Sequence, residues 1–182
     1  PDFLDLFEQP DQWTRSREMT GVLYLRATTL RRWSEGDFIE TILIPRLHEW
    51  NIRLALDVNG ATWASCWADK NAKLNLDVRL IDRIIAGGGR IDYVALQSVL
   101  SKPLPNPLPE NMQANCPPYT MRDRYQDIIW YTQEIRQRYP NVQVGIIDAL
   151  TAHGGDTISI FGALQQALEA ESLSLDFVHF DH

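Results

Sequence analysis

The sequence predicts an α/β protein built on a parallel sheet, and three observations support this. Residues 51–60 (NIRLALDVNG) hold a nearly continuous apolar run, which is typical of a strand buried on both faces in a parallel sheet. An amphipathic segment precedes this run, and an acid, Asp57, and a loop follow it. The same order of helix, strand and loop recurs at intervals of roughly 30 to 50 residues, which indicates a βα series.

We expect five strands, each rich in apolar residues and followed by a loop or turn. They lie at residues 21–28, 51–60, 91–100, 142–150 and 175–182. The segment before the first strand, residues 1–20, carries apolar anchors and no evident chemistry. Residues 29–36 are expected to form a polar loop.

Helices are expected between these strands. The first should begin at Asp37, with Glu40 completing a capping box, and Pro45 should bend or divide it. The second spans residues 75–86 and ends at three consecutive glycines, which is typical of a helix C-terminus.

Two further helices follow. One begins at Thr120, with Asp123 in its acidic first turn, and the other spans residues 158–171. Between the third strand and Thr120, residues 101–119 form a long proline-rich loop. We interpret this loop as an insertion because strand and helix periodicity continues on both sides of it. The chain is therefore expected to form a single domain over residues 1–182.

Composition excludes several classes of function. The formal net charge is −7, and no basic stripe is available to neutralise phosphates, so a nucleic-acid partner is not expected. No apolar run approaches the roughly 18 residues that span a bilayer. With 45% hydrophobic and 23% charged residues, the chain is typical of a soluble protein with a sizeable core. Composition leaves the oligomeric state open.

Two cysteines, Cys66 and Cys116, follow the second and third predicted strands. Those two loops are neighbours on one face of a parallel βα array, so a disulfide is geometrically conceivable. A disulfide would favour an oxidising compartment, and we expect a secreted or periplasmic protein on this basis. Two free thiols are the alternative.

Polar residues stand near the C-terminal ends of four predicted strands, namely Asp57, Gln97, Asp148 and Asp181. In parallel βα folds, ligands bind at these ends of the strands. A carboxylate at the edge of an apolar core must be paired or hydrogen-bonded, because its desolvation is costly. Each Asp could instead cap a helix or pair with a cation such as Arg26. Converging carboxylates otherwise suit general acid/base catalysis, and glycoside hydrolysis needs a pair of them.

Two tryptophans, Trp63 and Trp67, lie in the loop after the second predicted strand. They either anchor that loop or form a stacking surface for a sugar ring. A cluster near the end of the chain, His179, Asp181 and His182, resembles a metal-binding set, but no HExxH or CxxC spacing supports it. Nucleotide-binding glycine motifs are also missing from the sequence. We therefore predict no metal and no cofactor.

Several short motifs give the chain a family resemblance. LALDVNG after a helix, DYVALQS after three glycines, RQRYPNVQVGIIDAL and DFVHFDH together resemble bacterial glycoside-hydrolase-like TIM barrels over most of the chain. The resemblance implies a (β/α)8 barrel that binds carbohydrate at the C-terminal ends of its strands. Members of this family often carry Glu at the positions of Asp57 and Asp148, and an acid near Gln97. This chain has the shorter Asp twice and an amide once, which leaves a function in binding alone open.

A complete barrel takes about 250 residues. The five strands expected here, in 182 residues, correspond to five-eighths of such a barrel. The chain is therefore expected either to be an excerpt of a longer barrel or to form an open, doubly wound, five-stranded parallel sheet. Its end at His182, directly after a strand, favours the excerpt.

The leading hypothesis is a glycoside hydrolase that acts on an oligo- or polysaccharide. Asp148 is the first choice for the acid/base, and Asp57 and Asp181 would orient the substrate or complete the catalytic pair. Trp63 and Trp67 would stack on sugar. Hydrogen bonds to sugar hydroxyls would come from Arg26, Asn59, Gln97 and His179. The alternatives are a non-catalytic carbohydrate-binding module on the same scaffold and a metal-dependent hydrolase.

Overall fold

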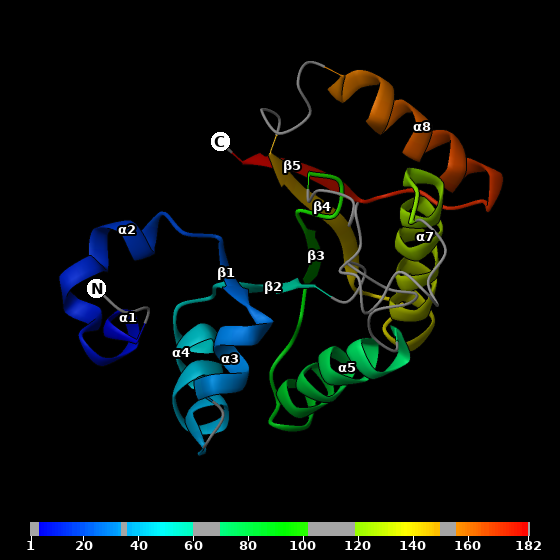
Figure 1. The fold of residues 1–182 in the computed structure, drawn as a ribbon. Coiled ribbons are helices and arrows are strands. Elements are labelled where there is room, and N and C mark those ends of the chain that lie inside the picture. Colours follow the sequence, from blue (N-terminus) through cyan, green and yellow to red (C-terminus); the bar gives the residue numbers. More distant parts are fainter. Residues whose placement is uncertain (1–3, 34–35, 60–69, 102–118, 150–155, 182) are drawn as a thin grey trace, which may run out of the picture.

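Five strands form one all-parallel sheet in the computed structural model, which describes residues 4–33, 36–59, 70–101, 119–149 and 156–181 (Figure 1). The strands are β1 (Val22–Arg26), β2 (Arg53–Val58), β3 (Tyr93–Gln97), β4 (Gln143–Ala149) and β5 (Phe177–Asp181). Each lies within one of the five segments that the sequence predicts as strands, so the α/β fold with a parallel sheet is confirmed.

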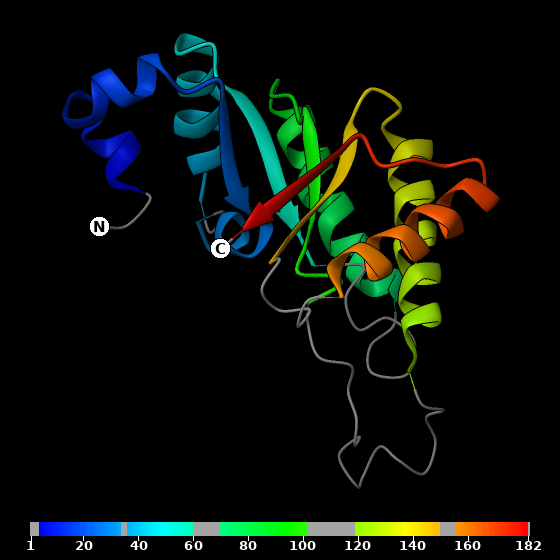
Figure 2. The same cartoon turned by 90° about the horizontal axis from the view of Figure 1, so that it is seen from above.

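The sheet is open and curled, like half of a barrel (Figures 1 and 2). Its strand order is β1-β2-β3-β4-β5, which follows the sequence without a reversal. The open parallel sheet that the sequence allows is therefore confirmed, whereas the strand order lacks the switch point of a doubly wound sheet. Because all strands run parallel, their C-terminal ends meet at one edge, where Arg26 is in register with Asp57 and Ala149 with Asp181.

The helices that link the strands surround the convex side of the sheet (Figure 1). They are α3 (Ala27–Trp33), a π-helical segment η2 (Ile39–Leu43), α4 (Ile44–Glu49), α5 (Lys70–Ala86), α7 (Met121–Arg138) and α8 (Thr157–Ala170). Three short elements precede β1, namely α1 (Asp5–Glu8), the 3-10 helix η1 (Pro10–Trp13) and α2 (Thr14–Glu18). The described helices include none that is both long enough and apolar enough to span a membrane.

The core fills the space between the convex face of the sheet and these helices. Successive side chains of a strand point to opposite faces, so every second residue of each strand contributes to this core. Leu54 and Leu56 of β2, for example, are buried there together with Ile81 and Ile84 of α5. The other set of residues faces the concave side, where the candidate site lies.

Two local expectations for residues 29–40 are wrong. Residues 29–33, expected in a polar loop, belong to helix α3. The capping box expected at Asp37 and Glu40 does not form, because the Glu40 carboxylate pairs with Arg83 of α5 at 2.6 Å. The effect expected of Pro45 is confirmed, since it lies in the first turn of α4 and follows the separate segment η2.

The free edge of the sheet at β5 is less covered than its centre. Val178 and Phe180 keep 42% and 43% of their surfaces exposed, whereas Val94 and Leu96 of β3 are fully buried. Each of the first four strands is followed by a helix that packs on the convex side. Phe180 makes an edge-to-face contact with Phe161 of α8, with ring centroids 5.3 Å apart.

Candidate functional site

A cavity of about 470 Å³ occupies the concave side of the sheet. All five strands contribute to it, because alternate residues of each strand point inward. The lining residues are Val22, Tyr24, Arg26, Ala55, Tyr93, Ala95, Gln97, Ile147, Phe177, His179 and Asp181. Of the residues that the sequence predicts as site residues, Arg26, Gln97, His179 and Asp181 are therefore brought together.

The cavity is apolar at its base and polar at its rim. Tyr93 and Phe177 form an edge-to-face aromatic pair, with ring centroids 5.8 Å apart, near the beginning of their strands. Ala55 and Ala95 also line the cavity, and their small side chains leave space in it. The rim consists of the last residues of three strands, Arg26, Gln97 and Asp181. A ligand with an apolar face and polar edges matches this arrangement.

Asp57 lies beneath the rim and organises it. Its side chain is 0% exposed, and Arg26 places Nε 3.5 Å from Oδ2 of this carboxylate. With its amide oriented to satisfy both neighbours, Gln97 donates to the same Oδ2 at 3.0 Å and accepts from Nη2 of Arg26 at 3.1 Å. The three side chains form a closed triangle, in which the guanidinium and the amide N–H both stabilise the charged carboxylate.

Tyr24 stands next to this triangle, and sequence reasoning missed it. Burial, followed by the adjacent Asp57 carboxylate, raises the pKa of Tyr24 well above its ordinary value, while Arg26 lowers it in part. The phenol therefore stays protonated at neutral pH, and its buried hydroxyl has no hydrogen-bond partner among the described residues. In the apolar run VLYLR, a tyrosine is an ordinary strand former. The available signal was its spacing of two from Arg26, which places both residues on one face.

Asp148 lies outside the cavity. Its neighbour Ile147 lines the cavity, so Asp148 points to the opposite face, where it is fully buried. The Asp148 carboxylate accepts hydrogen bonds from the backbone N–H groups of Leu100 at 2.7 Å, Ser101 at 3.1 Å and Ala149 at 2.9 Å. These contacts favour a structural role, in which Asp148 holds the turn after β3. Its assignment as the acid/base stays a prediction.

The turn after β3 begins with a residue in an unusual conformation. Ser98 has φ of 51°, in the left-handed region that a non-glycine residue adopts at a cost. Its backbone N–H donates to the carbonyl of Ile147 at 2.7 Å, and the turn then presents Leu100 and Ser101 to Asp148. Contacts with β4 therefore stabilise the strained backbone of Ser98, which immediately follows the rim residue Gln97.

The remaining sequence-predicted residues are not among the described residues that line the cavity. Asn59 follows β2 and is not among the residues that line the cavity. Trp63, Trp67, Cys66, Cys116 and His182 lie outside the described residues. Within the described part of the chain, no group of three or more His, Cys, Asp and Glu side chains is placed to hold a metal ion.

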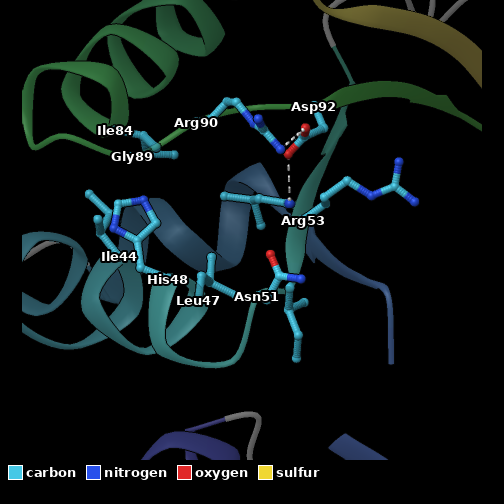
Figure 3. A pocket seen from close by; sticks show the side chains of 11 residues that line it. Ile44, Leu47, His48, Asn51, Arg53, Ile84, Gly89, Arg90 and Asp92 are labelled. Carbon is cyan, nitrogen blue, oxygen red and sulfur yellow. Dashed lines mark hydrogen bonds and ion pairs between the residues drawn. The ribbon is translucent and has the colours of Figure 1, made fainter. Parts of the chain in front are cut away.

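A second cavity, of about 330 Å³, lies at the opposite, N-terminal ends of β2 and β3 (Figure 3). Its walls include Ile44 and Ile84, and the imidazole of His48 points into it (Figure 3). The charged pair in it, Arg90 and Asp92, is joined at 2.7 Å. Because parallel βα folds bind ligands at the C-terminal ends of the strands, we take the concave cavity as the candidate site.

Comparison with known proteins identifies no family for this chain, since its sequence matches no family model and no curated protein. The resemblance to glycoside-hydrolase-like barrels therefore stays a prediction.

Proposed function

We propose that this domain binds a carbohydrate in the concave cavity. The observation that carries the proposal is the cavity's division into an aromatic base and a hydrogen-bonding rim. A sugar ring presents C–H groups on its faces and hydroxyls around its edge, so it matches both parts. Tyr93 and Phe177 supply the aromatic surface, and Arg26, Gln97, His179 and Asp181 supply donors and acceptors.

The rim is held in place before any ligand arrives. Arg26 keeps 61% of its side chain exposed, yet its guanidinium is held by Asp57 and Gln97. A side chain that is already ordered loses less conformational entropy on binding, which favours affinity. The buried Asp57 therefore serves the site by positioning its neighbours rather than by touching the ligand.

Hydrolysis of a glycosidic bond is the second candidate function, favoured by Asp181. Among the described residues that line the cavity, Asp181 is the one carboxylate. Glycoside hydrolysis uses two carboxyl groups across the scissile bond. Asp57 is the nearest candidate for the second, but it is fully buried and engaged by Arg26 and Gln97. Binding is therefore the function that the geometry favours, on a scaffold that we propose to be five βα units of a (β/α)8, glycoside-hydrolase-like barrel.

The test is to titrate the protein with a panel of neutral and acidic oligosaccharides and to measure the heat of binding by calorimetry. We expect saturable binding of at least one of them, and an Asp181→Asn variant should lose about 10- to 100-fold in affinity, as expected when a hydrogen bond to a charged group is removed. Glu171→Gln, the same change at an exposed residue that follows α8, is the matched control and should bind like the wild type.

Product analysis in the same samples separates the two candidates. Release of reducing sugar that disappears in Asp181→Asn would select hydrolysis, whereas binding without product would select the binding module. If no oligosaccharide in the panel binds, the proposed function is wrong.

A further inference from the structure

The charges at the rim of the concave cavity do not balance. Among the described residues that line the cavity, Arg26 and Asp181 are the charged ones, with histidine counted as neutral. Asp57 lies directly beneath the rim, with its side chain 0% exposed, and adds a second negative charge. Two carboxylates therefore accompany one guanidinium, so the described rim carries an excess of one negative charge.

This excess reaches the inside of the cavity. The Arg26 side chain is 61% exposed, so water screens much of its charge, whereas the buried Asp57 carboxylate is screened less. One guanidinium cannot neutralise two carboxylates, whichever of them it contacts. The neighbouring Tyr24 agrees with this sign. Burial is the main cause that raises its pKa, and the charges of Asp57 and Asp181 then raise it by more than Arg26 lowers it.

Among the described residues of the concave face, the next cation lies at the other end of the cavity. Arg53 shares a face of β2 with Asp57 but comes four residues earlier, roughly 13 Å along the strand. Its guanidinium is held there by Tyr93, to whose hydroxyl it donates and whose ring centroid lies 5.2 Å away. This separation exceeds the Debye length of about 8 Å at physiological ionic strength, so the exposed Arg53 offsets little of the charge at the rim.

We propose that the concave cavity selects an oligosaccharide that carries a protonated amino group, and that this group contacts Asp181 at the rim. The inference rests on the proposed function, because it names the class of sugar that the cavity takes. Asp181 is exposed at the end of β5 whereas Asp57 is covered, so Asp181 is the acid within reach of a ligand. An ammonium group only donates hydrogen bonds and a carboxylate only accepts them, so the two are complementary. An acidic sugar meets the excess negative charge and is disfavoured.

The experiment uses pairs of oligosaccharides that differ in one substituent, an amino group in one member and a hydroxyl in the other. Suitable pairs are β-1,4-linked oligomers of glucosamine and of glucose of equal length, and the corresponding oligomers of galactosamine and of galactose. In calorimetric titrations at low salt, with the amine protonated, the amino member of at least one pair should bind about 3- to 20-fold more tightly than its partner. The advantage should shrink at about 1 M salt, where the Debye length falls to about 3 Å.

Asp181→Asn separates the charge of the site from its shape. This variant should weaken binding of the amino member more than binding of the hydroxyl member, so the ratio of their affinities falls toward one. Glu171→Gln, at an exposed residue outside the cavity, is the matched control and should keep the wild-type ratio.

Three results would overturn the inference while carbohydrate binding stands. They are a hydroxyl member that binds at least as tightly as the amino member in every pair, an acidic oligosaccharide that binds most tightly of all, and a ratio that Asp181→Asn leaves unchanged. If no oligosaccharide binds, whether amino, neutral or acidic, the proposed function itself is wrong and the inference falls with it.

Discussion

At the scale of single residues, Asp57 and Asp148 show how one residue type serves two purposes. Both lie near the end of a strand, and both are fully buried. Asp57 is held by two rim side chains that face the cavity, whereas Asp148 is held by backbone N–H groups on the other face of the sheet. Asp57 therefore holds side chains at the rim of the cavity, and Asp148 holds the backbone of the turn after β3.

Replacing Asp148 by Asn tests this division of roles. The amide keeps one acceptor oxygen, so it cannot accept both from Leu100, which donates to Oδ2, and from Ala149, which donates to Oδ1. We therefore expect a loss of about 1.5–3 kcal/mol of unfolding free energy. Thermal denaturation should show a fall of roughly 3–10 °C in Tm for a protein of this size. Oligosaccharide binding by the folded variant should be unchanged. A variant that keeps its Tm and loses turnover would instead make Asp148 the acid/base that the sequence predicts.

The difference between these two aspartates could not be predicted from the sequence. Both strands are apolar on both faces, so no alternation of apolar and polar residues fixes which face each Asp takes. The presence of acids at the strand ends, and the meeting of Arg26 and Asp57 at one edge, followed from the parallel βα pattern. Tyr24 was not predicted as a site residue because a tyrosine inside an apolar strand is an ordinary strand former.

At the scale of elements, the sequence correctly predicts the start of a helix where the contacts that cap it are between neighbouring residues. Thr120 and Asp123 form the capping box at the start of α7, as the spacing of the two residues indicates. Helix α3 was missed because its stability comes from distant contacts. Leu30 is buried in the core, and Arg31 pairs with Asp77 of α5 at 2.9 Å. Tertiary contacts of this kind override local propensity and leave no trace in the segment itself.

The capping box of α7 has a predictable pH dependence. The Thr120 hydroxyl, first, and the Thr120 backbone N–H lower the pKa of Asp123. Because its pKa is lower in the folded state, Asp123 contributes stability above the ordinary aspartate pKa of about 3.9, and this contribution is lost as the pH falls through the folded value. We expect Asp123→Ala to cost about 0.5–1 kcal/mol at pH 7 and less at pH 3, measured by urea denaturation.

The control for that experiment is Asp156→Ala. Asp156 occupies the N-cap of α8 but makes no side-chain cap hydrogen bond. The stability difference of this variant from the wild type should be smaller and should vary less with pH. An Asp123→Ala variant whose deficit is the same at pH 3 and pH 7 would show that the charge of Asp123 does not stabilise α7.

At the scale of the whole molecule, the curled sheet makes the site. A flat sheet would spread Arg26, Gln97 and Asp181 along a line, whereas in the curled sheet inward-facing residues of all five strands line one cavity. The parallel sheet and its strands were predictable from repeated apolar runs. The sequential strand order, and with it the placement of the connecting helices on the convex side, depends on how the helices pack and was not specified by any one segment.

We propose that a carbohydrate binds in the concave cavity at the C-terminal ends of the strands. The most direct test is to titrate 15N-labelled protein with the oligosaccharide that binds most tightly and to map the changes in amide chemical shift. We predict that the largest saturable changes lie at the ends of β1, β3 and β5, around Arg26, Gln97 and Asp181. Changes centred on the second cavity, around His48 and Arg90, or no saturable change at any residue, would contradict the claim.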